Sequence, residues 1–174
     1  MSISLTIPYR RFEYFGGELS VEIAETLSRI IGIAVEVCVK VIATDLRDRD
    51  DPENGSLDFT IRVSCPDINC ETQAIFVDMP YYEVPDSPPY SKVISVYNIS
   101  DGMLHEALVI ASAICIAKKC SNVISDVALY WVDREFASAE YYERKFQYDE
   151  PLTTPSQSGA LTVFERKRNS SASS

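Results

Sequence analysis

The segment TDLRDRDDPENGS, residues 44–56, holds seven charged side chains, and five of them are acidic. Carboxylates at alternate positions, then a glycine, then a glutamate six residues later would form the calcium-binding loop of an EF-hand. Asp48 and Asp50 fit the first two ligand positions, but Pro52 occupies the third. Two interleaved arginines would repel a cation. The spacing argues against a metal site and leaves two interpretations: a solvated hairpin loop, or a recognition loop for a basic protein.

Nucleophilic catalysis would need the single histidine, His105, beside a serine or cysteine and a third, orienting group. Ser112 and Cys115 stand seven and ten residues further along the same predicted helix. That spacing separates them from His105 by roughly 10–15 Å. The chain also lacks the GxGxxG, P-loop, GxSxG and HExxH motifs. We therefore expect no enzymatic activity, no cofactor and a structural or surface role for His105.

The five cysteines are Cys38, Cys65, Cys70, Cys115 and Cys120. Four residues separate Cys65 from Cys70, but neither a second cysteine pair nor a histidine pair accompanies them, which argues against zinc. The number is odd, and the N-terminal segment lacks the basic start and apolar core of a secretory signal. Reduced, structural cysteines in a cytoplasmic protein are the expectation.

The charge balance favours a protein partner over nucleic acid. The chain has 26 acidic and 16 basic side chains, a formal net charge of −10. Residues 151–174 carry one acid and three bases, a net charge of +2, which leaves −12 on residues 1–150. A field of this sign repels phosphate backbones and attracts a basic surface. An acidic composition also serves solubility alone, so that explanation stays open.

Aromatic residues accompany these acids. Three tyrosines lie in the proline-rich segment PYYEVPDSPPY, residues 80–90, and a second aromatic group lies within residues 130–142. Tyrosine and tryptophan dominate interface hot spots, although core packing is the alternative. The predicted partner-binding residues are Asp45, Asp48, Asp50, Asp51, Glu53, Tyr81, Tyr82 and Trp131.

Hydropathy patterns predict the elements that position these residues. Apolar side chains alternate with polar ones in four consecutive segments, which predicts an antiparallel meander: residues 33–43, 57–64, 71–79 and 91–99. Residues 3–7 are expected to form a short edge strand that ends at Pro8, and residues 122–132 a further strand. The four prolines of residues 80–90 predict a stiff loop without regular structure.

Helical spacing of apolar residues predicts helices over 18–31 and 102–119, with Ser100 or Asp101 as N-cap of the second. A short third helix is expected to begin at Ala137 or Ser138. The longest apolar run, ALVIASAICIA, lies within the second helix and is too short to cross a membrane, so it is predicted to be a buried core helix.

The order β-α-β-β-β-β-α-β-α predicts a single α+β domain over residues 1–150. Its expected form is a mainly antiparallel sheet of about five strands, with the helices packed on one face. Residues 151–174 are rich in proline, serine, threonine and glycine, which indicates a flexible C-terminal tail.

The stretch HEALVIASAICIAKKCSNVISDVALYWVDREFASAEYYERKF, residues 105–146, resembles the C-terminal part of several small bacterial immunity proteins of polymorphic toxin systems. In those proteins a buried helix ends in a small-residue turn. A strand with an aspartate then leads to an aromatic residue, and a short helix begun by serine follows. The corresponding residues here are Ser121-Asn122, Asp126, Tyr130-Trp131 and Ser138. The resemblance covers about a quarter of the chain and assigns no particular immunity family.

The resemblance implies a function. Immunity proteins bind a cognate toxin and block its active site, without cofactor and without catalysis of their own. An acidic immunity protein would mimic nucleic acid where the toxin is a nuclease with a basic active site. The expectation is a cytoplasmic immunity protein whose partner is a basic toxin, with neither nucleic acid nor membrane as partner. The alternatives are an adaptor or chaperone for a secreted effector, and a small enzyme or ligand-binding domain built on acids and His105.

The acidic segment can be tested by charge reversal. Replacing Asp48, Asp50 and Asp51 together by lysine is expected to leave the free energy of unfolding unchanged and to slow association with a basic toxin about tenfold, because electrostatic steering is lost. Stopped-flow association at low salt measures this rate. An unchanged rate would identify the segment as a solvated hairpin tip.

Overall fold

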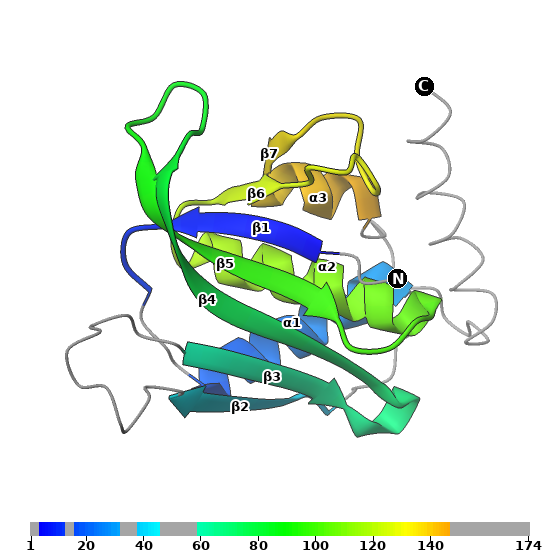
Figure 1. Cartoon of the computed structure of the whole chain (residues 1–174). Coiled ribbons are helices and arrows are strands. Elements are labelled where there is room, and N and C mark those ends of the chain that lie inside the picture. Colours follow the sequence, from blue (N-terminus) through cyan, green and yellow to red (C-terminus); the bar gives the residue numbers. More distant parts are fainter. Residues whose placement is uncertain (1–3, 13–15, 32–37, 46–58, 147–174) are drawn as a thin grey trace.

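A computed structural model of the 174-residue chain describes residues 4–12, 16–31, 38–45 and 59–146. These residues form three α-helices and one antiparallel sheet of seven strands, so the predicted α+β class is confirmed (Figure 1). The elements are β1 (Ser4–Tyr9), α1 (Gly16–Ile31), β2 (Lys40–Asp45), β3 (Phe59–Cys65), the 3-10 helix η1 (Pro66–Ile68), β4 (Cys70–Tyr82), β5 (Tyr90–Asn98), α2 (Met103–Lys118), β6 (Val123–Ser125), β7 (Phe136–Ser138) and α3 (Ala139–Phe146).

The strands lie in the order β2-β3-β4-β5-β1-β6-β7. The first four of these strands form the predicted meander. Side chains of residues that are paired on neighbouring strands point to the same side of the sheet. Leu5 of β1, Val96 of β5, Ala74 of β4 and Ile61 of β3 form one such row, and all four are buried. Alternation along each strand thus supplies one apolar face to the core.

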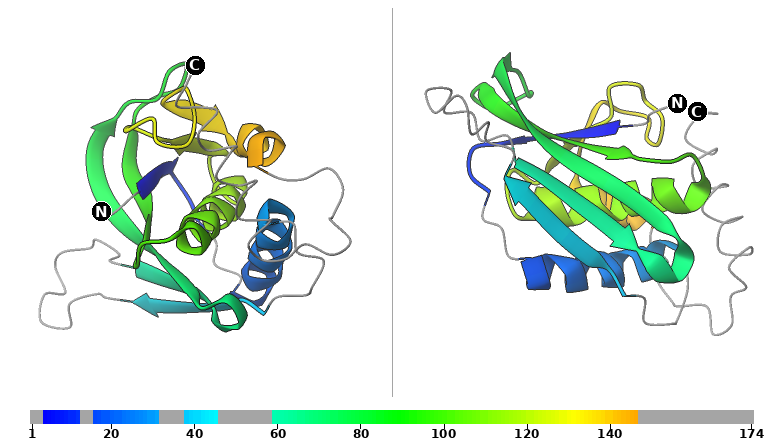
Figure 2. Two further views of the ribbon diagram at one scale, coloured as in Figure 1. Left: turned by 90° about the vertical axis from the view of Figure 1, so that its right-hand side faces the viewer. Right: turned by 60° about the horizontal axis from the view of Figure 1, so that its bottom comes forward.

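The sheet curves around α2, which lies against its concave face with α1 and α3 at its sides (Figure 2). Every residue from Glu106 to Ala117 is buried. The prediction of a buried core helix is confirmed, and so is the packing of the helices on one face of the sheet. No helix in the described ranges has the length and apolar character that a membrane span requires.

Strand β1 is an interior strand, which contradicts the predicted edge position. It pairs with β5 along its whole length and with β6 through Thr6 and Ser125. Pro8 is paired with Val93 of β5 but is not among the residues of β1 that pair with β6. An interior strand can therefore contain a proline near its end.

The sheet has seven strands where about five were predicted. One strand that was not predicted is β7, because residues 122–132 do not continue as a single strand. Pairing stops at Ser125. The carboxylate of Asp126 then accepts hydrogen bonds from the backbone N–H groups of residues 130, 131 and 132, which turns the chain out of the sheet. The chain re-enters the sheet as β7, opposite β6.

Two further predictions about local structure are wrong. Strand β4 runs on through Pro80 to Tyr82, because a bulge between Asp78 and Tyr82 leaves the proline outside the regular hydrogen-bonded register. The N-cap of α2 is Gly102, with φ 135° and no side-chain hydrogen bond, in place of Ser100 or Asp101. The chain reverses between β5 and α2 at a backbone conformation that glycine alone adopts readily, so the cap falls on the glycine.

Buried thiols and a buried phenol make the free energy of unfolding fall as the pH becomes alkaline. Burial raises the pKa of Cys115 and of Cys120 from 9.0 to about 11. Burial and then the charge of Asp78 raise the pKa of Tyr9 from 10.0 to about 12. Each group prefers its neutral form in the folded protein, so its contribution is complete below the unfolded pKa and disappears as the pH rises through the folded one.

We expect the free energy of unfolding to be constant up to about pH 9 and to fall between about pH 9 and 12, by roughly 2–3 kcal/mol for Cys115 alone. Urea unfolding at several pH values measures this dependence. The variant Cys115→Ser lacks the titrating thiol and should show a shallower decline. A free energy that stays flat to about pH 12 would contradict this reading of the core.

Candidate functional site

The hairpin that joins β4 to β5 projects beyond the body of the molecule (Figure 1). We refer to residues 78–90 as the projecting hairpin. Its strands pair again at Tyr82 and Tyr90, beyond the bulge, and the turn between them is closed by a hydrogen bond of 3.3 Å from the Ser87 N–H to the Val84 oxygen. The hairpin is therefore an ordered extension of the sheet.

Arg10, which directly follows β1, fixes the base of the projecting hairpin. Its Nη2 donates to the backbone oxygen of Pro88 at 2.9 Å, and its Nη1 donates to that of Pro89 at 3.2 Å. The guanidinium carbon also lies 4.1 Å from the centre of the Tyr90 ring. The planar guanidinium group of Arg10 thus donates hydrogen bonds to two carbonyl oxygens and lies over one aromatic ring at the same time, which the ammonium group of a lysine could not do.

The inner side of the projecting hairpin is anchored to the end of the sheet. The Tyr82 ring meets the Phe136 ring of β7 edge-on at a centroid distance of 6.4 Å. Val84 is buried, with 8% of its surface exposed. Burial also raises the pKa of the Tyr82 phenol above 10.0. The contact between Tyr82 and Phe136 holds the hairpin to the body.

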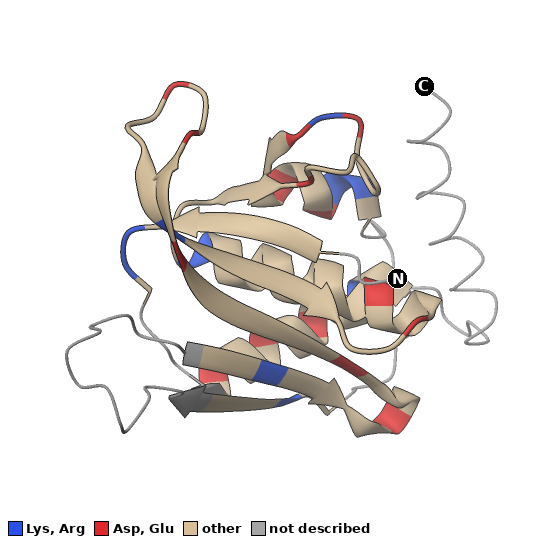
Figure 3. Ribbon diagram, in the orientation of Figure 1, with Lys and Arg blue, Asp and Glu red and all other residues tan. Residues whose placement is uncertain are grey.

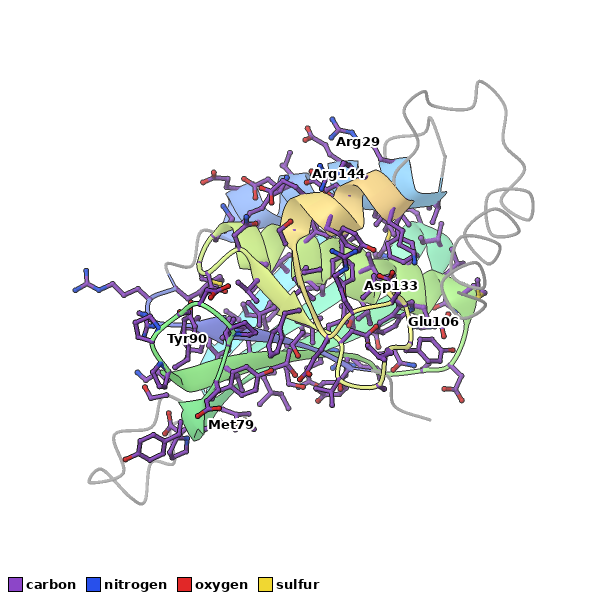
Figure 4. All side chains as sticks on the ribbon, turned by 90° about the horizontal axis from the view of Figure 1, so that it is seen from above. Arg29, Met79, Tyr90, Glu106, Asp133 and Arg144 are labelled. Atoms are coloured by element: carbon purple, nitrogen blue, oxygen red, sulfur yellow. The ribbon has the colours of Figure 1, made fainter. Side chains whose placement is uncertain are left out.

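The outer side of the projecting hairpin is aromatic and acidic. Tyr81 is 83% exposed and Met79 is 41% exposed. Figure 4 shows Met79 at the margin of the molecule. Carboxylates flank these side chains, from Asp78, Glu83 and Asp86, and Figure 3 marks acidic residues on this loop.

The backbone of the outer side is strained. Tyr81 and Asp86 each have a φ of 61°. A positive φ is tolerated by aspartate but is uncommon for a bulky side chain such as tyrosine, and costs on the order of 1–3 kcal/mol. The fold thus keeps a large aromatic ring in solvent on strained backbone, a combination typical of functional positions.

The structure brings together only part of the predicted partner-binding set. Tyr81 and Tyr82 are both in the projecting hairpin, but Tyr81 faces solvent and Tyr82 faces Phe136. Asp45 is the last residue of β2, opposite Phe59. Its side chain, and all of Asp48, Asp50, Asp51 and Glu53, lie outside the described residues.

Trp131 is fully buried, which corrects its prediction as a contact residue. The Asp126 carboxylate, itself buried, accepts the Trp131 N–H at 2.7 Å and the Tyr130 N–H at 3.1 Å. These bonds turn the Trp131 ring into the core, while the Tyr130 hydroxyl donates to Glu106 at 3.1 Å. Sequence alone could not separate a core tryptophan from an interface tryptophan because both need the same apolar ring.

His105 has a structural environment. Its Nδ1 lies 3.1 Å from both the backbone nitrogen and the backbone oxygen of Glu71, at the start of β4. Within the described ranges, no group of three or more histidine, cysteine or acidic residues could hold a metal ion.

No family model, curated protein or solved structure matches the chain significantly. The resemblance of residues 105–146 to immunity proteins therefore remains an expectation.

Two features of the projecting hairpin were not predicted. The two hydrogen bonds from Arg10 to Pro88 and Pro89, which we call the Arg10 clamp, join residues that are 78 and 79 positions apart in the sequence. No local sequence pattern reveals such a contact. Met79 was assigned to an ordinary strand end. The tyrosine pair within a proline-rich segment was the one usable signal in the sequence.

The Arg10 clamp can be tested by substitution. Arg10→Ala is expected to speed amide hydrogen exchange at Ser87 and along residues 82–90, and to lower the free energy of unfolding by only about 1 kcal/mol, because the hairpin lies outside the core. Arg11→Ala, at the exposed neighbouring position, is the matched control. Equal protection of the hairpin amides in both variants would contradict a clamp at Arg10.

Proposed function

We propose that this chain is an immunity protein that binds a cognate bacterial toxin and neutralises it by covering the toxin's active site. The observation that carries the proposal is the projecting hairpin, which presents the exposed Tyr81 on an anchored support. In this proposal the protein acts in the cytoplasm through binding alone, without catalysis and without a cofactor.

A protein partner suits the outer side of the projecting hairpin. An exposed tyrosine offers a large contact area and loses little conformational freedom on binding. The Arg10 clamp and the Tyr82–Phe136 contact order the support before binding, which reduces the entropic cost of association. The aromatic ring and its support together have the character of an interface anchor.

The charge of the site indicates a basic partner. The projecting hairpin carries three carboxylates close to Tyr81 in the sequence, from Asp78, Glu83 and Asp86, and the whole chain carries a net charge of −10. Complementary charge raises association rates and disfavours wrong partners. A nuclease toxin has a basic active site, and an acidic hairpin that enters it would replace the phosphates of the substrate.

The product of the neighbouring gene provides the direct test. We expect the two proteins to copurify and the present chain to restore growth to cells that express the neighbour's toxic domain. An adaptor or chaperone for a secreted effector would instead increase secretion of the neighbour and leave its toxicity intact. Absence of a complex together with absence of protection would exclude the proposed function.

Two substitutions of Tyr81 separate its contact from its strain. Tyr81→Ala and Tyr81→Gly both remove the ring, and each is expected to weaken toxin binding by about 10- to 30-fold. Only glycine relieves the positive φ, so Tyr81→Gly should be more stable than Tyr81→Ala by about 1 kcal/mol. Titration calorimetry with the toxin and urea unfolding measure the two effects.

Val21→Ala is the matched control for these variants. Val21 is an apolar side chain of α1 that is 57% exposed. Its truncation should change neither affinity nor growth rescue. Affinity that survives the loss of the Tyr81 ring would place the interface elsewhere on the molecule.

A further inference from the structure

Cys65 and Cys70 stand directly opposite each other in the sheet. Cys65 is the last residue of β3 and Cys70 the first of β4, and they are partners in the antiparallel register. The connection between them is the 3-10 helix η1 and Asn69, whose φ is 51°. A tight turn therefore places two cysteines at neighbouring positions on adjacent strands.

The geometry of this pair suits a disulfide bond. Directly opposed residues of an antiparallel pair have Cα atoms about 4.5 or 5.5 Å apart, and disulfides span Cα distances of about 4.4–6.8 Å. Side chains of such a pair also point to the same face of the sheet. Both side chains are buried, and both cysteines are free thiols in this structure. The register thus places the two cysteines within the range of Cα distances that a disulfide spans.

The two thiols also differ in their readiness to ionise. The Cys70 thiol beside Cys65 lowers the pKa of Cys65, and the neighbouring backbone amide of Ile68 acts in the same direction. The same contact, followed by burial, raises the pKa of Cys70. The contact between the two sulfurs thus favours ionisation of one thiol of the pair, and Cys65 is the thiol that also lies beside the backbone amide of Ile68.

The cysteines of the α2 region lack these properties. The Cys115 sulfur lies 3.3 Å from the Thr26 hydroxyl oxygen, and the Cys120 thiol donates to the Ile116 oxygen at 3.2 Å. Burial raises the pKa of each to about 11, which keeps both protonated at neutral pH. Neither is placed opposite a second cysteine in the sheet register.

We propose that Cys65 and Cys70 form a dithiol site that small disulfides, such as glutathione disulfide, oxidise to an intramolecular disulfide. The Cys65 thiolate attacks one sulfur of glutathione disulfide and releases a glutathione thiolate. Cys70 then loses its proton and attacks the Cys65 sulfur, which releases the second glutathione. The protein gives up two electrons and two protons, and the oxidant becomes two molecules of reduced glutathione.

Access to the pair comes through the turn. Pro66, Asp67 and Asn69 are exposed, so a local opening of η1 uncovers the Cys65 sulfur without unfolding of the sheet. The resulting disulfide would fix the β3–β4 turn covalently. This site is independent of the projecting hairpin and of the proposed toxin binding.

The test uses the full chain carrying Cys38→Ser, because Cys38 is exposed and would react by itself. The folded protein is incubated with glutathione disulfide, and free thiols are counted after unfolding. We expect two of the four remaining thiols to be lost, and dithiothreitol to restore them. Residues 63–92 form one tryptic peptide that contains both cysteines and no other, and its mass should fall by about two units.

Substitution of one partner provides the control. With Cys70→Ser in the same background, oxidation should stop at one glutathione bound to Cys65, which mass spectrometry of the same peptide detects. Retention of all four thiols in the parent, or loss of thiols outside residues 63–92, would overturn the proposal. The parent's peptide mass decides the matter even where the serine variant fails to fold.

Discussion

The fold depends on the burial of α2 on all sides. Its central residues touch the sheet on one side and α1 and α3 on the others, and full burial of each large aliphatic side chain contributes about 1.5–3 kcal/mol. Glu106 is buried with them and is tolerated because the Tyr130 hydroxyl donates to it. Since Tyr130 belongs to the loop organised by Asp126, packing of the helix also determines the path of the chain between β6 and β7.

The sequence predicted those elements whose apolar residues form a regular local pattern. The meander was found because apolar and polar residues alternate along each strand, and α2 because of the continuous apolar run of residues 107–117. What could not be predicted depends on contacts between distant residues. Asp126 ends β6 through bonds to three later amides, and the Arg10 clamp reaches across to Pro88 and Pro89. For the candidate site, Tyr81 and Trp131 were both predicted as partner-binding residues; Tyr81 is exposed, whereas Trp131 is buried in the core.

The projecting hairpin and the core differ in backbone strain. In the core, apolar residues fill regular strands and helices whose backbone is unstrained. At the hairpin, Tyr81 has a positive φ and is exposed to solvent, while contacts of Arg10 with Pro88 and of Phe136 with Tyr82 anchor the rest of the hairpin. Stability is thus given up at one position in favour of a defined shape, which is the usual relation between a binding site and the scaffold that supports it.

The interior position of β1 has a consequence for how the protein is made. The described part of the sheet consists of the meander β2–β5 on one side and β6–β7 on the other, and β1 is the strand that joins them. A ribosome produces β1 before either of its neighbours, so this strand waits unpaired while residues up to β5, and then β6, are translated. Long-range pairing of this kind slows folding and exposes apolar edges meanwhile. Apolar residues of β1 therefore stay exposed on the nascent chain until the later strands pair with it and α2 closes over the sheet.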